Sequence, residues 1–264
     1  MYSLNKYWYA SFEKSPFHFY NDFGEWNQMD KMGHCWTAYA ESHYMYGLYK
    51  WTGVKDEKAV LIGGVLGWTF QASIELLDGY SEKWGASIPD LAANTLGSAI
   101  FVSQQLIWKE QKFKIKFSSH VAKYDQQELA IRNRVLDLYG SSLSEKLLKD
   151  YNAQTYWLSF NPFHFNANSQ SRFPKWLDLS VGYGVDDIYG GYENIWTLQE
   201  TEFDFSQIER KRQLFLSLDI DWTKIKTQSK LVNVLLKGLN IFKFPAPALQ
   251  LNNSKNLKFH WIYF

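Results

Sequence analysis

The sequence predicts an α+β protein in which an N-terminal, membrane-associated helical bundle precedes an antiparallel sheet. Between residues 29 and 94, apolar segments carry polar side chains at the three- or four-residue spacing of helices. From about residue 109, apolar and polar residues alternate in short runs, as they do in strands with one wet face. We therefore expect a helical region at 1–108 and a mainly β region at 109–264.

The composition narrows the classes of partner. With 28 Lys and Arg against 27 Asp and Glu, the net charge is +1, so the chain lacks the basic excess that neutralises a nucleic-acid backbone. Aromatic residues make up 18% while the mean hydropathy is −0.36. This combination suits a surface that is partly wet and partly apolar, such as a membrane interface. An aromatic-rich soluble fold is the alternative.

Two further observations concern the cellular setting. The single cysteine, Cys35, excludes an internal disulfide, and we expect it to fill space on the first helix. The first six residues lack the basic and apolar regions of a signal peptide. An export signal is therefore not visible in this chain.

The first helix is expected at residues 30–51. Asp30 and His34 lie one turn apart on it, and Glu41, seven residues after His34, returns to the same face. His43 lies on the opposite side. Glu41 therefore joins the candidate site and His43 does not.

The second helix is expected at residues 59–77. It carries Glu75 near its end, and Asp78 and Ser81 follow in a turn. Its uninterrupted apolar part is shorter than the roughly 20 residues that span a bilayer. The helix is either a buried core helix or a membrane-embedded one shortened by functional polar residues.

The third helix opens at Ser87, which can cap it, with Pro89 in its first turn. Asp90 lies near the positive end of the helix dipole, so capping electrostatics is the alternative to a role in the site. Asn94 shares the face of Asp90, and an asparagine inside an apolar helix needs partners for its amide. A role in a buried polar site is the stronger interpretation of Asn94.

Polar side chains on three apolar helices should face one another or a ligand, because a buried carboxylate or imidazole without a partner costs several kcal/mol. The predicted cluster consists of Asp30, Lys31, His34, Glu41, Glu75, Asp78, Ser81, Asp90 and Asn94. A divalent metal on His34, Glu75 and Asp78 is conceivable, and no particular cofactor is indicated. Lys31 could instead be a surface cation at the start of its helix.

Five alternating runs predict the β region: 112–117, 155–160, 176–184, 214–222 and 257–264. In the fourth run, leucines face one way while Ser217, Asp219 and Asp221 face the other. The sheet either lies over helices or forms the wall of a transmembrane barrel with its apolar side outward. Residues 120–150 are expected to be helical in part, and 166–172 and 190–202 to be surface loops.

A basic amphipathic helix is expected near residues 228–242. Leu231, Val234, Leu235 and Leu239 share one side of it, and several lysines surround it. The helix could lie in a membrane interface or pack on the sheet.

Four motifs together resemble one family: Asp30-Lys31-x-x-His34, Glu75-x-x-Asp78-Gly79-x-Ser81, Trp84-Gly85 and Asp90-x-x-x-Asn94-x-x-Gly97. They look like the YfiM-like family of predicted periplasmic lipoproteins of unknown function, common in Bacteroidota. The similarity extends through 156–159 and 179–184. Over about residues 30–97 the skeleton is also similar, more loosely, to VanZ-like membrane proteins, which usually have an arginine at this chain's 78–81 turn. The resemblance implies a cell-envelope setting and no established catalytic activity.

Two functions follow from these observations. The first is a binding or structural protein at the outer membrane or its periplasmic face, in which the cluster holds an ion or a lipid headgroup. Membrane lipid, or an envelope protein complex, would be its partner. The alternative is an enzyme acting on an envelope lipid or a phosphorylated sugar-lipid. His34 would then be the acid/base, Glu75 or Asp90 would orient it, and Lys31 would hold an anionic group.

Overall fold

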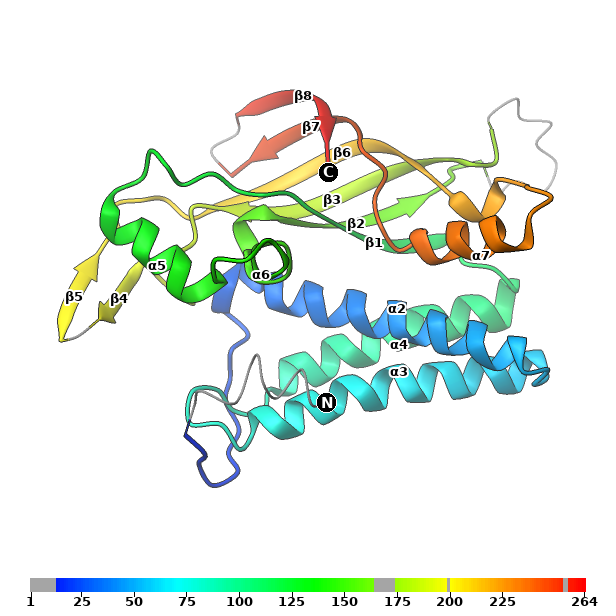
Figure 1. Cartoon of the computed structure of the whole chain (residues 1–264), viewed down its shortest axis with the longest axis horizontal. Helices are drawn as coiled ribbons and strands as arrows, with labels where there is room; N and C mark the ends of the chain where they lie inside the picture. Colours follow the sequence, from blue (N-terminus) through cyan, green and yellow to red (C-terminus); the bar gives the residue numbers. More distant parts are fainter. Residues whose placement is uncertain (1–12, 164–173, 199, 254–255) are drawn as a thin grey trace. The chain divides into compact units, whose positions relative to one another are not determined.

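The computed structural model describes residues 13–163, 174–198, 200–253 and 256–264, and the chain divides into two compact units (Figure 1). The helical unit comprises residues 1–23 and 30–110. The sheet unit comprises residues 24–29 and 111–264. Helices followed by an antiparallel sheet confirm the α+β class. The loop predicted at 166–172 lies outside the described residues.

Three long helices build the helical unit and run alongside one another in Figure 1: α2 (Met29–Trp51), α3 (Asp56–Asp78) and α4 (Ile88–Trp108). Small residues permit close contact, because a Cβ atom at Gly97 of α4 would lie 2.1 Å from the carbonyl oxygen of Cys35 in α2. Ser87 caps α4 as the sequence predicts. Its hydroxyl accepts a hydrogen bond from the backbone N–H of Asp90 at 3.1 Å, and Pro89 lies in the first turn.

α3 is the one helix in the described part of the chain whose length and composition would allow it to cross a membrane. Core helices of soluble proteins often have the same length and composition, but they are mostly buried. In α3 only 33% of the most apolar stretch is buried. Gly63 and Gly67 approach α2, whereas Leu61, Val65 and Leu76 are more than half exposed. The helix therefore packs through small residues and presents its large apolar side chains outward.

Six antiparallel strands form the main sheet, in the order β1-β2-β3-β6-β7-β8. Their bounds are β1 (Phe113–Ser119), β2 (Gln154–Phe160), β3 (Leu177–Asp186), β6 (Lys211–Ile220), β7 (Ala246–Asn252) and β8 (Leu257–Tyr263). Among the described residues β1 and β8 do not pair, so the sheet is open. Residues 241–243 cover part of the outer edge of β1, since the Phe117 N–H donates to the Ile241 carbonyl at 3.0 Å.

One strand of this sheet has no counterpart among the five predicted runs. β7 follows Pro245 and contains Pro247, and prolines argue against a central strand. The structure accommodates Pro247 at an irregularity, where the register between β7 and β8 shifts between Ala246 and Ala248.

The remaining elements of the sheet unit are short: α5 (Leu129–Tyr139), α6 (Leu143–Lys149), α7 (Lys230–Leu239), the hairpin of β4 (Ile195–Leu198) and β5 (Thr201–Asp204), and the 3-10 helices η2 (Glu25–Gln28), η3 (Tyr151–Ala153) and η4 (Trp222–Lys224). The β4–β5 hairpin occupies much of 190–202, for which the sequence predicts a loop; four-residue strands are too short to show alternation. A small apolar core joins this hairpin to α5. It contains Ile131, Val135, Tyr139, Tyr189, Trp196 and Phe205.

The main sheet buries the face that carries its polar and charged side chains, together with aromatic ones such as Phe215 and Trp157, and it exposes aliphatic side chains on the other face. In β6, Gln213, Ser217 and Asp219 are buried. The alternate residues Leu214 and Leu216 are 52% and 45% exposed, and Leu218 is similarly exposed. Antiparallel sheets in water show the reverse pattern, with the apolar side buried.

Ion pairs explain how the charged face is buried. The Lys114 ammonium lies 2.7 Å from Asp178 and 2.8 Å from Asp221, and the Lys116 ammonium lies 2.9 Å from Asp219. Lys243 lies 4.0 Å from Asp219, with its ammonium 4.9 Å from the ring centre of Trp157. Burial lowers the pKa of Lys243 to about 8, against the raising effect of Asp219. Three lysines thus face three aspartates inside the sheet unit.

Replacing Asp219 with Asn is expected to destabilise the sheet unit by about 3–5 kcal/mol, because Lys116 is fully buried and would lose its carboxylate partner. Denaturant unfolding followed by tryptophan fluorescence measures the change. Asp137→Asn is the control, since Asp137 pairs with Arg134 at an exposed site and its loss should change little. Equal stability of Asp219→Asn and the wild type would contradict a buried charged face.

Candidate functional site

Side chains from all three helices of the helical unit meet at one end of α2. α2 supplies Lys31 and His34, and α3 supplies Glu75. The start of α4 holds this end together, because the Ser87 backbone N–H donates to Glu75 Oε2 at 3.0 Å and the Ser87 hydroxyl donates to Asp22 Oδ1 at 2.5 Å. The cap residue of α4 thus connects α3 and the segment before α2 to the cluster.

Lys31 is buried at the centre of three carboxylates. Its ammonium lies 2.7 Å from Asp22 Oδ2, 2.9 Å from Asp30 Oδ2 and 2.7 Å from Asp90 Oδ1. Burial opposes its charge, but Asp30 and Asp90 outweigh that effect and hold the Lys31 pKa above its usual value. The ammonium therefore stays charged and joins α2 to α4.

His34 is oriented by Asn94. Its Nδ1 lies 3.1 Å from Asn94 Oδ1, so Nδ1–H donates to the amide oxygen and Nε2 points the other way. Three carboxylate oxygens surround Nε2: Glu75 Oε1 at 3.6 Å, Asp30 Oδ1 at 3.8 Å and Asp90 Oδ2 at 3.9 Å. Asp30 and Asp90 face Lys31 with one oxygen and His34 with the other.

The cluster carries more negative than positive charge. Four carboxylates, from Asp22, Asp30, Glu75 and Asp90, face one lysine and one imidazole. Burial raises the pKa of Glu75 to about 7 and raises that of Asp90, where the Asp30 charge adds to the effect. Burial also lowers the His34 pKa, but Asp30, Asp90 and Glu75 more than offset this and leave it above its usual value. Each shift favours binding of a proton or another cation.

Three buried atoms of the cluster have no hydrogen-bond partner within the described residues: Glu75 Oε1, Asn94 Nδ2 and Asp90 Oδ1, the last of which lies in the ion pair with Lys31. Asn94 is fully buried and Glu75 nearly so. An unmade hydrogen bond on a buried polar atom costs about 1–3 kcal/mol. Glu75 Oε1 lies 3.6 Å from Nε2 of His34. It is therefore available to a cation that binds beside the imidazole.

One oxygen or nitrogen atom each from Asp30, His34 and Asp90 lies within 4.8 Å of the others. Ligands bound to a tetrahedral ion at about 2.0–2.2 Å are separated by about 3.3–3.6 Å. The 3.8 and 3.9 Å distances from His34 Nε2 are slightly wider than that spacing. The three atoms would have to move inward, from separations of up to 4.8 Å, to hold one divalent ion together.

The other predicted residues lie apart from this centre. Glu41 accepts a hydrogen bond from Gln71 Nε2 at 2.9 Å, two turns along α2, and burial raises its pKa to about 7. Ser81 is buried in the turn after α3, where its hydroxyl accepts from the Lys83 N–H at 3.3 Å. Asp78 acts on the cluster through its charge, which raises the Glu75 pKa.

The metal ligands that the sequence suggests differ from those that converge in space. The predicted set was built on His34, Glu75 and Asp78, whereas the compact group contains Asp30 and Asp90 beside His34. Asp22 is a member that the sequence interpretation missed. Asp22 lies before α2, in a segment with turn signals. No helical spacing therefore relates it to the other residues of the cluster.

Residues 19–105 match the model of a family described as predicted periplasmic lipoprotein (DUF2279). The matched stretch contains every residue of the cluster, from Asp22 to Asn94. No curated protein and no solved structure matches the chain. The match supports a periplasmic lipoprotein family and a cell-envelope setting, and it specifies neither ligand nor activity.

The ionisation of Glu75 is expected to make the metal-free protein less stable as the pH rises from about 5 to about 8. The Glu75 pKa is about 7 in the fold against a usual value of 4.5, so the cost of its charge is absent below the lower value and complete above the higher. The raised His34 pKa acts in the same direction, since the stability it contributes is lost as the pH rises through that pKa.

Replacing Glu75 with Gln should therefore flatten the pH dependence of stability by on the order of 2 kcal/mol across this range. Thermal or denaturant unfolding in the presence of a chelator measures it. Glu57→Gln, at an exposed position of α3, is the control and should keep the wild-type profile. Parallel profiles for Glu75→Gln and the wild type would refute the assigned cost.

Proposed function

Starting from the similarity of residues 19–105 to a predicted periplasmic lipoprotein family, we propose that this protein binds a divalent metal ion in the cell envelope while it is held against a membrane. It acts as a binding or structural protein. The observation that carries the proposal is the convergence of Asp30 Oδ1, His34 Nε2 and Asp90 Oδ2 from two helices.

The donor set indicates which ion would bind. One imidazole nitrogen and two carboxylate oxygens suit Zn²⁺ or Mn²⁺ better than Ca²⁺, which takes oxygen ligands. Asn94 fixes the tautomer that leaves Nε2 free to bind, a role that hydrogen-bond partners of metal ligands commonly have. Glu75 Oε1 is close enough to become a fourth ligand or to accept a proton from a bound water.

The net negative charge of the cluster favours binding of a metal ion, but Lys31 limits the affinity. Lys31 already neutralises part of the negative charge, on the carboxylate oxygens that face away from His34. The remaining excess is relieved either by protons on Glu75, Asp90 and His34 or by a metal ion. Metal binding therefore releases protons and strengthens as the pH rises.

The membrane part of the proposal rests on two outward apolar surfaces. α3 exposes large apolar side chains along its length. The main sheet exposes leucines and buries charged residues, which is the alternation of outer-membrane β proteins whose apolar side contacts lipid. These two surfaces support the outer membrane as the proposed location, with membrane lipid as the proposed partner.

Protein stripped with a chelator should bind one equivalent of Zn²⁺ or Mn²⁺, measured by calorimetric titration and by elemental analysis after dialysis. Replacing His34 with Ala or Asp90 with Asn should weaken binding by at least tenfold, and Asn94→Ala by about 10–100-fold. Binding by the wild type should be weaker at pH 6 than at pH 8, because protons compete for the same atoms.

Glu41→Gln is the matched control for this experiment, since it neutralises another buried carboxylate of the same helices that lies away from His34. It should bind the ion as the wild type does. No stoichiometric ion in any preparation, or equal losses in Asp90→Asn and Glu41→Gln, would overturn the metal site.

A further inference from the structure

The end of the chain has an unusual distribution of charge. Residues 222–264 contain seven lysines and no aspartate or glutamate. Because the whole chain has a net charge of +1, residues 1–221 carry a net charge of −6. A basic segment of this kind is attracted to an anionic surface even when the whole protein is almost neutral.

α7 lies in this basic segment and is strongly amphipathic. Leu231 and Val234 are 70% and 66% exposed, and Leu235 and Leu239 are about half exposed. None of the residues of α7 is buried. A basic helix with an outward apolar face is typical of helices that lie in the interface of a membrane.

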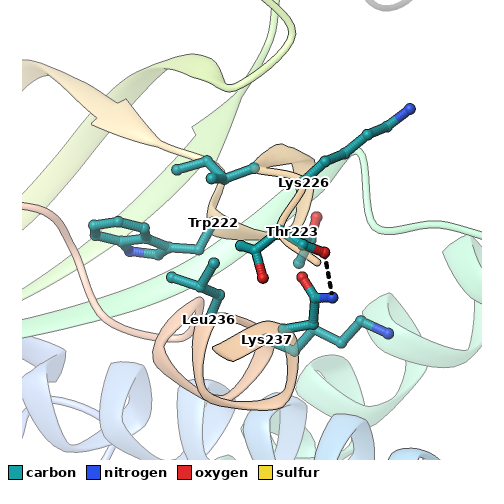
Figure 2. A pocket seen from close by; sticks show the side chains of 8 residues that line it. Trp222, Thr223, Lys226, Leu236 and Lys237 are labelled. Carbon is teal, nitrogen blue, oxygen red and sulfur yellow. Dashed lines mark hydrogen bonds between the residues drawn. The ribbon is translucent and has the colours of Figure 1, made fainter. Parts of the chain in front are cut away.

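Between η4 and α7 is an open pocket of about 370 Å³ (Figure 2). Trp222, Ile225 and Leu236 supply its apolar part. In Figure 2 the side chains of Lys226 and Lys237 extend outward on the same side of the pocket, one from each wall. The pocket therefore combines an apolar floor with two cations at its mouth.

The two ammonium groups of Lys226 and Lys237 are the cationic donors of the pocket. Its hydroxyl and amide groups are already engaged: Thr223 donates to Asp221 at 2.6 Å, and Asn233 donates to the Thr227 carbonyl at 3.0 Å. Among the described residues neither Lys226 nor Lys237 has an ion-pair partner. Asp221 is buried against Lys114, so it does not neutralise the pocket mouth.

We propose that this pocket binds the phosphate of an anionic phospholipid headgroup, with the apolar face of α7 contacting the acyl chains. Lysine ammonium groups bind phosphate as point charges, and tryptophan favours the level of the headgroups. The proposal rests on the membrane part of the proposed function and is independent of the metal site in the helical unit. It makes α7 the element that selects anionic over zwitterionic lipid.

Flotation of the full-length protein with vesicles tests the proposal. The wild type should bind vesicles containing phosphatidylglycerol more tightly than vesicles of phosphatidylcholine alone. The double variant Lys226→Gln/Lys237→Gln should bind the anionic vesicles about 25-fold more weakly, at about fivefold per lysine. His34→Ala should bind them as the wild type does, which separates this site from the metal site.

A second double variant, Lys123→Gln/Lys146→Gln, removes the same charge outside the basic segment and away from α7, and should weaken binding much less. Equal losses in the two double variants would overturn the pocket and leave only a general attraction to anionic surfaces. Equal binding of the wild type to both kinds of vesicle would overturn the headgroup site but keep the membrane contact. Binding to neither would overturn the membrane proposal as well.

Free phosphate is the remaining source of the same chemistry. Titration of the wild type with inorganic phosphate, without vesicles and at constant ionic strength, should give no saturable binding. Saturable binding that Lys226→Gln/Lys237→Gln abolishes would assign the pocket to a soluble anion and contradict the lipid proposal.

Discussion

Both units of this protein depend on the requirement that a buried charge meets a partner of opposite sign. An unpaired buried ion costs several kcal/mol, so charged side chains enter an interior only in groups. Here the groups are large: Lys31 and His34 among carboxylates in the helical unit, and lysines facing Asp178, Asp219 and Asp221 in the sheet unit. Large apolar side chains then cover much of the outside of each unit.

The two charged groups differ in balance, and this difference separates a structural role from a binding role. In the sheet unit three lysines match three aspartates, and the pairs connect β1 to β3 and β6. In the helical unit four carboxylates exceed the two cationic partners. The excess raises the pKa of Glu75 and Asp90 and leaves Nε2 of His34 facing oxygens at 3.6–3.9 Å. Only the second arrangement has an excess of negative charge that another cation would neutralise.

Much of the helical unit could be predicted because its signals are local. Asp30 and His34 share a face at a spacing of four residues, and Ser87 with Pro89 marks the start of α4. Asp22 could not be found in this way, because a capping hydroxyl of a distant helix brings it to the cluster. Glu41 shares the face of His34 but lies two turns further along α2. Two residues on the same helix face therefore need not be in contact.

The sheet unit shows the limits of alternation. The pattern in 214–222 separates leucines from aspartates, yet it does not indicate which side is buried, because that depends on strands far away in the sequence. Lys114 and Lys116 look like solvated residues until the aspartates of β3 and β6 lie opposite them. β7 could not be predicted because Pro245 and Pro247 argue against a strand. Only its pairing with β8, a strand that follows later in the chain, shows the register shift that accommodates a proline.

Diffraction from crystals grown with Zn²⁺, with data collected on both sides of the zinc absorption edge, shows whether these side chains hold a metal ion. We expect one anomalous peak about 2.0–2.2 Å from Asp30 Oδ1, His34 Nε2 and Asp90 Oδ2, with Asn94 still bound to Nδ1. Zinc peaks at exposed side chains alone, with these three atoms as far apart as before, would contradict it.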